Sequence, residues 1–205
     1  MSTASSIKKA LQKVGLSYTI ERSGGNISGE YLIYDTSILS SRIFVKEHAI
    51  DSMMAYDTQA LPGDVLLFST NQHYLVAHKN PEVLLNTVIF YDAALLKCNI
   101  NNGKILRMSG ETWGTNYRKV PVFAEVKTSL RGICTEATIS DPTDLMEEKY
   151  GNIFTDKLHL YLASGEDLRA LDRFEPRSGE YFKVEAVREW VYPGIQIAEL
   201  SEDKR

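Results

Sequence analysis

Several features that mark common protein classes are scarce in this chain. It has two cysteines, Cys98 and Cys134, which are too few for a disulfide framework or a four-cysteine zinc site. We expect both thiols to be reduced and structural. Among the four histidines, His73 and His78 lie five residues apart, so a straight strand would place them on opposite faces. The sequence therefore predicts no metal site and no cofactor.

Catalytic motifs are absent as well. The sequence contains no glycine-rich phosphate-binding loop, no Gly-x-Ser-x-Gly motif and no His-Glu-x-x-His motif. Asp64 and Asp172 occupy matching places in a repeated pattern, but an aspartate that opens a hairpin strand typically bonds the amides of its own turn. We therefore expect a protein without enzymatic activity.

Long apolar runs and a strong net charge are also missing. No stretch approaches the roughly 20 apolar residues of a membrane span, and no apolar run of signal-peptide length follows the first residues. We expect no membrane partner, and a protein that stays in a cytoplasm or is packed into a particle assembled there. The formal charge of −4 argues against a surface built to neutralise phosphates.

The sequence does contain a hairpin pattern that occurs twice. Residues 171–187, and a weaker copy at residues 62–77, have an Asp before a short strand, then a turn of small or polar residues. An aromatic residue then leads a second strand whose apolar residues alternate, and a period of two places them on one face of a sheet. The chain therefore looks like two versions of one small β unit.

The whole pattern predicts a mainly β protein with two small SH3-like β-barrel units, one N-terminal α-helix and long loops. Ile7, Ala10, Leu11 and Val14 have helical spacing, and Gly15 is placed to end the helix. Short strands at regular spacing favour barrels, because closure removes exposed sheet edges. We predict that residues 1–108 form the helix and first barrel, residues 109–118 a linker, and residues 119–205 the second barrel.

Two segments with weak periodicity, residues 35–61 and 140–156, are predicted to be loops that meet neighbouring subunits or close a lumen. Met and Tyr suit adaptable interfaces, although they also serve as ordinary core. The candidate interface residues are Met53, Met54, Tyr56, Leu145, Met146 and Tyr150. A run of acidic residues is most simply a solvated face, but inside a ring it would repel DNA phosphates. These channel-facing candidates are Asp141, Asp144, Glu147 and Glu148.

Three segments of the second unit resemble the end of tailed-bacteriophage head-closure and head-tail connector proteins. They are residues 171–174 (Leu-Asp-Arg-Phe), residues 179–184 (Gly-Glu-Tyr-Phe-Lys-Val) and residues 191–200, which include the bend Pro193-Gly194. In the first unit, Gly63-Asp64 and Tyr74-Leu75-Val76 are similar to virion proteins of the same neck region. Typical head-closure proteins carry one such barrel, whereas this chain has the pattern of two.

The resemblance implies a structural virion protein that forms a homo-oligomeric ring below the portal. Such a ring joins the portal or an adaptor protein to a tail terminator or tail-tube protein, and retains or passes DNA without reading its sequence. A tail-tube or baseplate component is a close alternative. A different alternative is a nucleic-acid-binding β-barrel that stacks bases on aromatic side chains. The candidates for stacking are Tyr74, Phe90, Tyr91, Tyr181 and Phe182.

Overall fold

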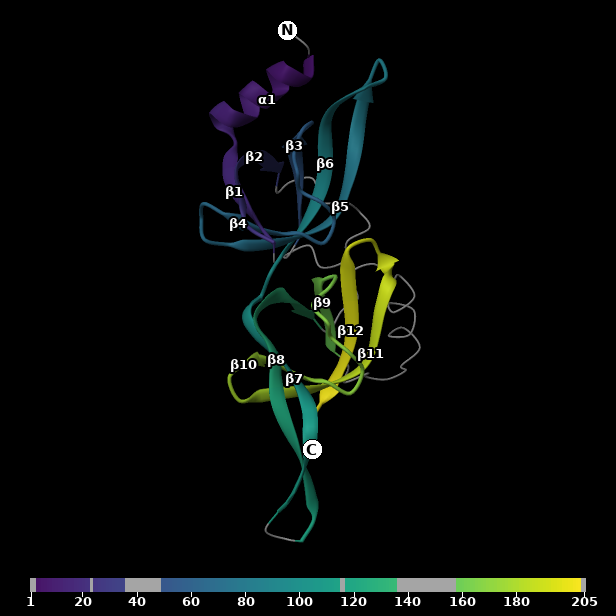
Figure 1. Cartoon of the computed structure of the whole chain (residues 1–205). Helices are drawn as coiled ribbons and strands as arrows, with labels where there is room; N and C mark the ends of the chain where they lie inside the picture. Colours follow the sequence, from purple (N-terminus) through teal and green to yellow (C-terminus); the bar gives the residue numbers. More distant parts are fainter. Residues whose placement is uncertain (1–2, 23, 36–48, 115–116, 136–157, 204–205) are drawn as a thin grey trace, which may run out of the picture. The chain divides into compact units, whose positions relative to one another are not determined.

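The described part of the chain folds into one N-terminal helix and two six-stranded β-barrels (Figure 1). The computed structural model describes residues 3–22, 24–35, 49–114, 117–135 and 158–203. One compact unit comprises Met1–Cys98 with Tyr192–Ile195, and the other comprises Asn99–Val191 with Gln196–Arg205. The predicted fold class, mainly β with two small SH3-like barrels and one N-terminal helix, is confirmed.

The first unit opens with helix α1 (Thr3–Val14), which packs against β2, β3 and β6. Leu11 is fully buried, as its helical spacing predicts, whereas Val14 is exposed. The helix ends where the amide of Gly15 donates to the Leu11 carbonyl at 2.7 Å. A Cβ on Gly15 would lie 2.5 Å from that carbonyl oxygen, so this stop requires glycine.

Six strands of the first unit close into a barrel in the order β1-β2-β3-β6-β5-β4. Closure occurs between β1 and β4, where Tyr18 lies opposite Phe68. The interior is an apolar cluster that includes Ile20, Leu32 and Met54. The strands are β1 (Leu16–Glu21), β2 (Ile27–Asp35), β3 (Ala49–Ala55), β4 (Val65–Phe68), β5 (His73–Leu84) and β6 (Thr87–Lys97).

The second barrel repeats this topology. Its strand order is β10-β11-β12-β9-β8-β7. Read in the reverse direction, this is the order of the first barrel with six added to each strand number, so equivalent strands have the same neighbours. It closes between β7 and β10, where Ile105 lies opposite Phe174, and Phe174 is fully buried in the apolar core. The strands are β7 (Ile100–Trp113), β8 (Lys119–Thr135), β9 (Leu158–Ala163), β10 (Arg173–Arg177), β11 (Glu180–Tyr192) and β12 (Ile195–Glu202).

The predicted boundary between the units is wrong. The chain passes from one unit to the other at Cys98 and Asn99, and β7 already belongs to the second barrel. The predicted linker, residues 109–118, begins inside β7, which continues to Trp113 and pairs with β8, so that Gly110 is opposite Val122. The polar residues of this stretch read as a linker because the outer part of the hairpin has no core to face.

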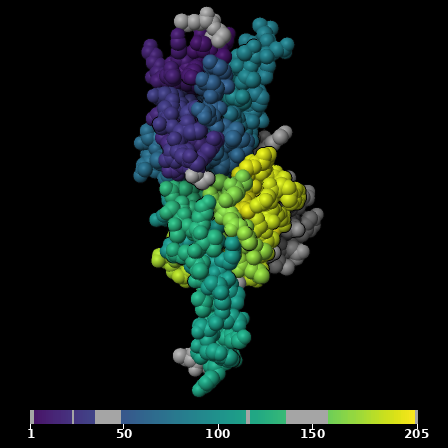
Figure 2. All heavy atoms as spheres, viewed as in Figure 1, coloured from purple at the N-terminus to yellow at the C-terminus, as the bar shows by residue number. Residues whose placement is uncertain are grey.

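Two hairpins extend beyond the strands that flank them. β7 pairs with β8 from Ile100 out to Trp113, whereas β10 pairs with β7 only at residues 104–106. We call residues 108–114 and 117–123 the β7–β8 arm, and Figure 2 shows it in teal as a narrow projection from the second barrel. In the first unit, β4 pairs with β5 only at residues 73–75, and β3 pairs with β6 as far as Phe90. The outer part of the β5–β6 hairpin continues alone to a turn at Leu85. We call residues 80–92 the β5–β6 arm (Figure 1).

Candidate assembly surfaces

In the first barrel, Arg22 and Asp64 form a two-pronged ion pair beside the turn that precedes β4. The Nε of Arg22 donates to Oδ1 of Asp64 at 2.8 Å, and its Nη2 donates to Oδ2. The same Nη2 donates to the carbonyl of Gln59 at 2.8 Å, and Asp64 Oδ2 accepts the amide of Leu61 at 2.7 Å. One carboxylate therefore ties the end of β1 to the β3–β4 connection.

The second barrel contains the same arrangement. Arg107 donates through Nε and Nη2 to the two carboxylate oxygens of Asp172, at 2.9 and 2.8 Å. Its Nη2 donates to the carbonyl of Asp167 at 2.7 Å, and Asp172 Oδ2 accepts the amide of Arg169 at 2.9 Å. We call each arrangement an Arg–Asp clamp, and the hydrogen bonds to Asp172 raise the pKa of the Arg107 guanidinium.

The two clamps lie on equivalent backbone. The carbonyl of Asp64 accepts the amide of Val76 at 3.0 Å, and the carbonyl of Asp172 accepts the amide of Val184 at 2.9 Å. Asp172 follows Asp64 by the same 108 positions by which Val184 follows Val76. The predicted bond from each Asp to its turn amides is confirmed. Both carboxylates therefore bind an arginine and a turn amide of their own barrel.

The structure describes three of the candidate interface residues, and they differ in exposure. Met54 is fully buried and belongs to the core of the first barrel, which was the alternative reading. Met53 is half-buried on β3, and Tyr56 is 37% exposed just beyond the end of that strand. The Met-containing part of the predicted loop 35–61 is therefore a strand, and Met54 has no surface to offer a partner.

The remaining candidates from the sequence lie outside the described residues. These are the interface candidates Leu145, Met146 and Tyr150 and the acidic candidates Asp141, Asp144, Glu147 and Glu148.

The aromatic residues proposed to stack on bases do not form a common platform. Tyr74 is buried, stacks on Phe68 with ring centroids 4.3 Å apart, and donates to Gln72 at 2.9 Å. The Lys79 ammonium lies over the ring of Tyr91, 4.0 Å from the ring centroid. The Arg173 guanidinium lies 5.0 Å from the ring of Tyr181. Phe90 is half-buried and Phe182 packs against the second core. Most of these rings therefore already have partners in the fold.

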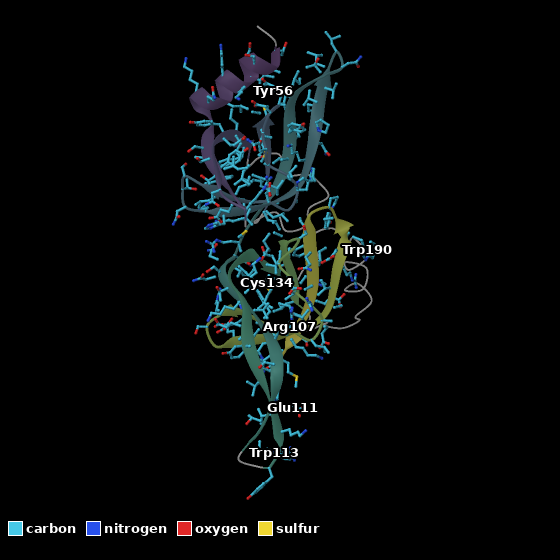
Figure 3. All side chains as sticks on the ribbon, viewed as in Figure 1. Tyr56, Arg107, Glu111, Trp113, Cys134 and Trp190 are labelled. Atoms are coloured by element: carbon cyan, nitrogen blue, oxygen red, sulfur yellow. The ribbon has the colours of Figure 1, made fainter. Side chains whose placement is uncertain are left out.

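The β7–β8 arm displays large apolar side chains to solvent. Trp113 is 70% exposed and Tyr117 is 91% exposed, and Figure 3 shows Trp113 far along the arm from Arg107. On the opposite strand, Val120 and Val122 are also exposed and share one face, because they lie two residues apart; Trp113, which lies opposite Lys119, is on the other face. A set of this kind on one projecting hairpin is typical of an interaction surface.

The β5–β6 arm also has exposed apolar side chains at its end, and acidic residues lie near them in the sequence. Val83, Leu84 and Leu85 are exposed, and Leu85 is 91% exposed at the turn. Burial raises the pKa of Asp92 on this arm, and the neighbouring carboxylates of Glu82 and Asp51 raise it further. Residues 80–92 contain two acidic residues and no Lys, Arg or His.

Backbone conformation at the two arm ends is unusual for the residues present. Leu85 has φ of 48° and Tyr117 has φ of 52°, in the left-handed region that favours Gly, Asn and Asp. A two-residue hairpin turn would accept Asn or Gly at the position of Leu85 with less strain. Apolar exposure and local strain therefore coincide at the end of each arm.

Cysteine and histidine placement offers no further site. Cys98 is buried and Cys134 is half-buried, and the two do not form a disulfide. Among the described residues, no three His, Cys, Asp or Glu side chains are grouped closely enough to hold a metal ion. The sequence places His73 and His78 on opposite faces only if the strand is straight. In the structure the pairing of β5 with β6 shifts register at Ala77, so side chains do not simply alternate between the two histidines.

Sequence reasoning missed the arginine partners and the arms. Arg22 and Arg107 lie 42 and 65 residues before their aspartates, so local pattern gives no sign of the pairing. A signal for the β7–β8 arm was present in the alternation of Val120, Val122 and Val126, all of which lie in β8.

Comparison with known proteins gives little further information. No family model and no curated protein matches the chain. Among solved structures, the solution structure of protein SF1141 from Shigella flexneri 2a aligns with 51% of this chain and 93% of that one. The sequence identity is 10% and the TM-score is 0.36, which is too low a similarity to support an argument. No helix in the described part of the chain has the length and apolar character needed to cross a membrane.

Proposed function

We propose that the chain is a non-enzymatic structural protein of a tailed-phage virion, located at the head-tail interface. In this role it forms a homo-oligomeric ring that joins the portal or adaptor to a tail terminator or tail-tube protein. DNA is retained by the ring or passes through it without sequence-specific contacts. The resemblance of residues 171–200 to head-closure and connector proteins supplies the specific role.

The observation that carries an assembly function is the exposure of large apolar side chains on the two arms. Trp113 and Tyr117 are of the residue types that dominate core and interface energetics when buried, yet here they face solvent on a narrow hairpin, as the aliphatic Leu85 does on the other. The small barrels below these arms already have closed apolar cores of their own. The arms are therefore available for contact with other protein surfaces.

The test is co-sedimentation of the full chain with purified portal, adaptor and tail components. The proposal predicts that the chain moves into a larger complex with at least one neck or tail component and not with an unrelated phage capsid fraction. A chain that joins none of these components would remove the neck role. Retention of single-stranded nucleic acid by such a chain would favour the binding-module alternative instead.

A further inference from the structure

A cluster of side chains on the outer face of the second barrel surrounds Arg173 of β10. Phe174, the next residue, is buried in the core, so Arg173 points to the outer face. Its guanidinium carbon lies 3.8 Å from the ring centroid of Phe123 on β8 and 5.0 Å from that of Tyr181 on β11. Its Nε donates to Oδ2 of Asp203 at 2.6 Å. The cluster therefore joins β8, β10, β11 and the residue that follows β12.

The barrel topology that the two units share does not require this cluster. Arg173 pairs with Lys183 on β11, and 108 positions earlier Val65 pairs with Leu75 at the equivalent place in the first barrel. Val65 is apolar and buried, and that barrel closes without a guanidinium at this position. Arg173 is therefore an addition to the common barrel and not a condition for its closure.

The surroundings of Arg173 suit a carboxylate. Stacking on aromatic rings leaves the in-plane N–H donors of a guanidinium available, and these donors match the oxygens of a carboxylate. The Arg173 side chain is 15% exposed and the Asp203 side chain is fully buried, so little water reaches the pair. A buried guanidinium without a counter-charge is unfavourable. The site therefore favours a bound carboxylate, and its own chain supplies one.

We propose that Phe123, Arg173 and Tyr181 form a carboxylate-binding site that the chain fills with its own Asp203. The amide of Asp203 also donates to the Tyr181 carbonyl at 3.1 Å, which holds the carboxylate beside Arg173. While Asp203 is bound, a carboxylate from another molecule cannot enter. The contact is therefore a strap that ties the end of β12 to the root of the β7–β8 arm, because Phe123 is the innermost β8 residue of that arm.

Chemical rescue with acetate tests the site in the full-length protein by calorimetry. Asp203→Ala should lower the melting temperature by roughly 5 °C or more, because Arg173 loses the partner of a buried ion pair. Added acetate should raise it again, and the rise should grow with acetate concentration, since the anion binds the folded chain. Sodium chloride at the same ionic strength should not. If acetate acts no differently from chloride, the site does not bind carboxylates and the proposal is wrong.

Three controls separate the site from general effects of acetate. Asp203→Ala combined with Arg173→Gln lacks the guanidinium and should gain nothing from acetate beyond the chloride effect. Glu199→Ala removes an acidic residue of β12 whose partner, Arg188, is 54% exposed, and acetate should not restore its stability. The wild-type chain should not respond, because Asp203 already fills the site. Equal gains in all of these chains would contradict the proposal.

Hydrogen exchange locates the strap and provides a second measurement if Asp203→Ala is too unstable to melt cooperatively. Asp203→Asn is the milder variant, because it keeps the size of the side chain and removes its charge. It should speed amide exchange in β10, at the start of β11 and at residues 119–123, and leave the first barrel unchanged. Uniform acceleration across both barrels, or none, would overturn the strap. None of these results depends on ring formation, so the strap and the proposed function can fail separately.

Discussion

At the scale of single residues, Asp64 and Asp172 accept the same set of hydrogen bonds in the two barrels. Each binds an arginine through two oxygens and also accepts a turn amide. The side chain of Asp172 is only 4% exposed, so water cannot replace these partners when the carboxylate is removed. A buried donor left without its acceptor costs more than the net value of the bond it made.

Substitution of either clamp aspartate should therefore destabilise its barrel. We expect Asp172→Ala to lower the free energy of unfolding by about 2–3 kcal/mol, because it leaves Arg107 and the Arg169 amide without their acceptor. Asp64→Ala should have a comparable effect. Urea denaturation measures both, with Arg188→Ala as a control that removes an exposed ion pair and should change little. If Asp172→Ala changed the free energy of unfolding no more than Arg188→Ala does, the clamp would not stabilise the fold.

Asp92 gives a prediction that depends on pH. Its pKa is raised by burial and by the carboxylates of Glu82 and Asp51. Below the ordinary aspartate pKa, the carboxyl is protonated in folded and unfolded chains, so it costs no stability. As pH rises through the window between the ordinary and the raised pKa, the unfolded chain ionises first and the fold loses stability.

Asp92→Asn should consequently raise the melting temperature at neutral pH and leave it unchanged at a pH below the ordinary aspartate pKa. Thermal unfolding followed by circular dichroism over this range measures the difference. An equal increase at every pH would mean that the charge of Asp92 is not responsible.

At the scale of secondary structure, the sequence predicts the hairpins well and their limits poorly. The Asp that opens β4 and β10 and the turns after these strands were recognisable, because turn chemistry is local. The long reach of β7 was not, since its outer half faces solvent on both sides and carries polar residues. β3 was read as part of a loop because its hydrophobic periodicity is weak, although Met54 is core. Pairings across 42 or 65 residues leave no local trace.

The β7–β8 hairpin offers a matched pair of glycine substitutions, one on each strand. A Cβ on Gly132 would lie 2.6 Å from the Tyr161 carbonyl oxygen and 2.5 Å from Leu162 Cδ2, whereas a Cβ on Gly110 of the β7–β8 arm would meet nothing within 4 Å. We expect Gly132→Ala to cost about 1–3 kcal/mol through overpacking against β9. Gly110→Ala should be neutral or slightly stabilising. Chemical denaturation compares them, and equal effects would contradict the packing described for β8 and β9.

At the scale of the whole molecule, one barrel topology occurs twice in one chain. The strand order is the same, the Arg–Asp clamps match atom for atom in their main contacts, and the clamp turns are 108 positions apart. The barrels differ in what they display, because the exposed side chains at the end of one arm are aliphatic and those of the other include Trp113 and Tyr117.

The most direct test of the central claim is negative-stain imaging of the purified full-length chain. The proposal predicts closed rings with an open centre wide enough for duplex DNA, either alone or after addition of portal or tail components. Monomers in every one of these samples would contradict it.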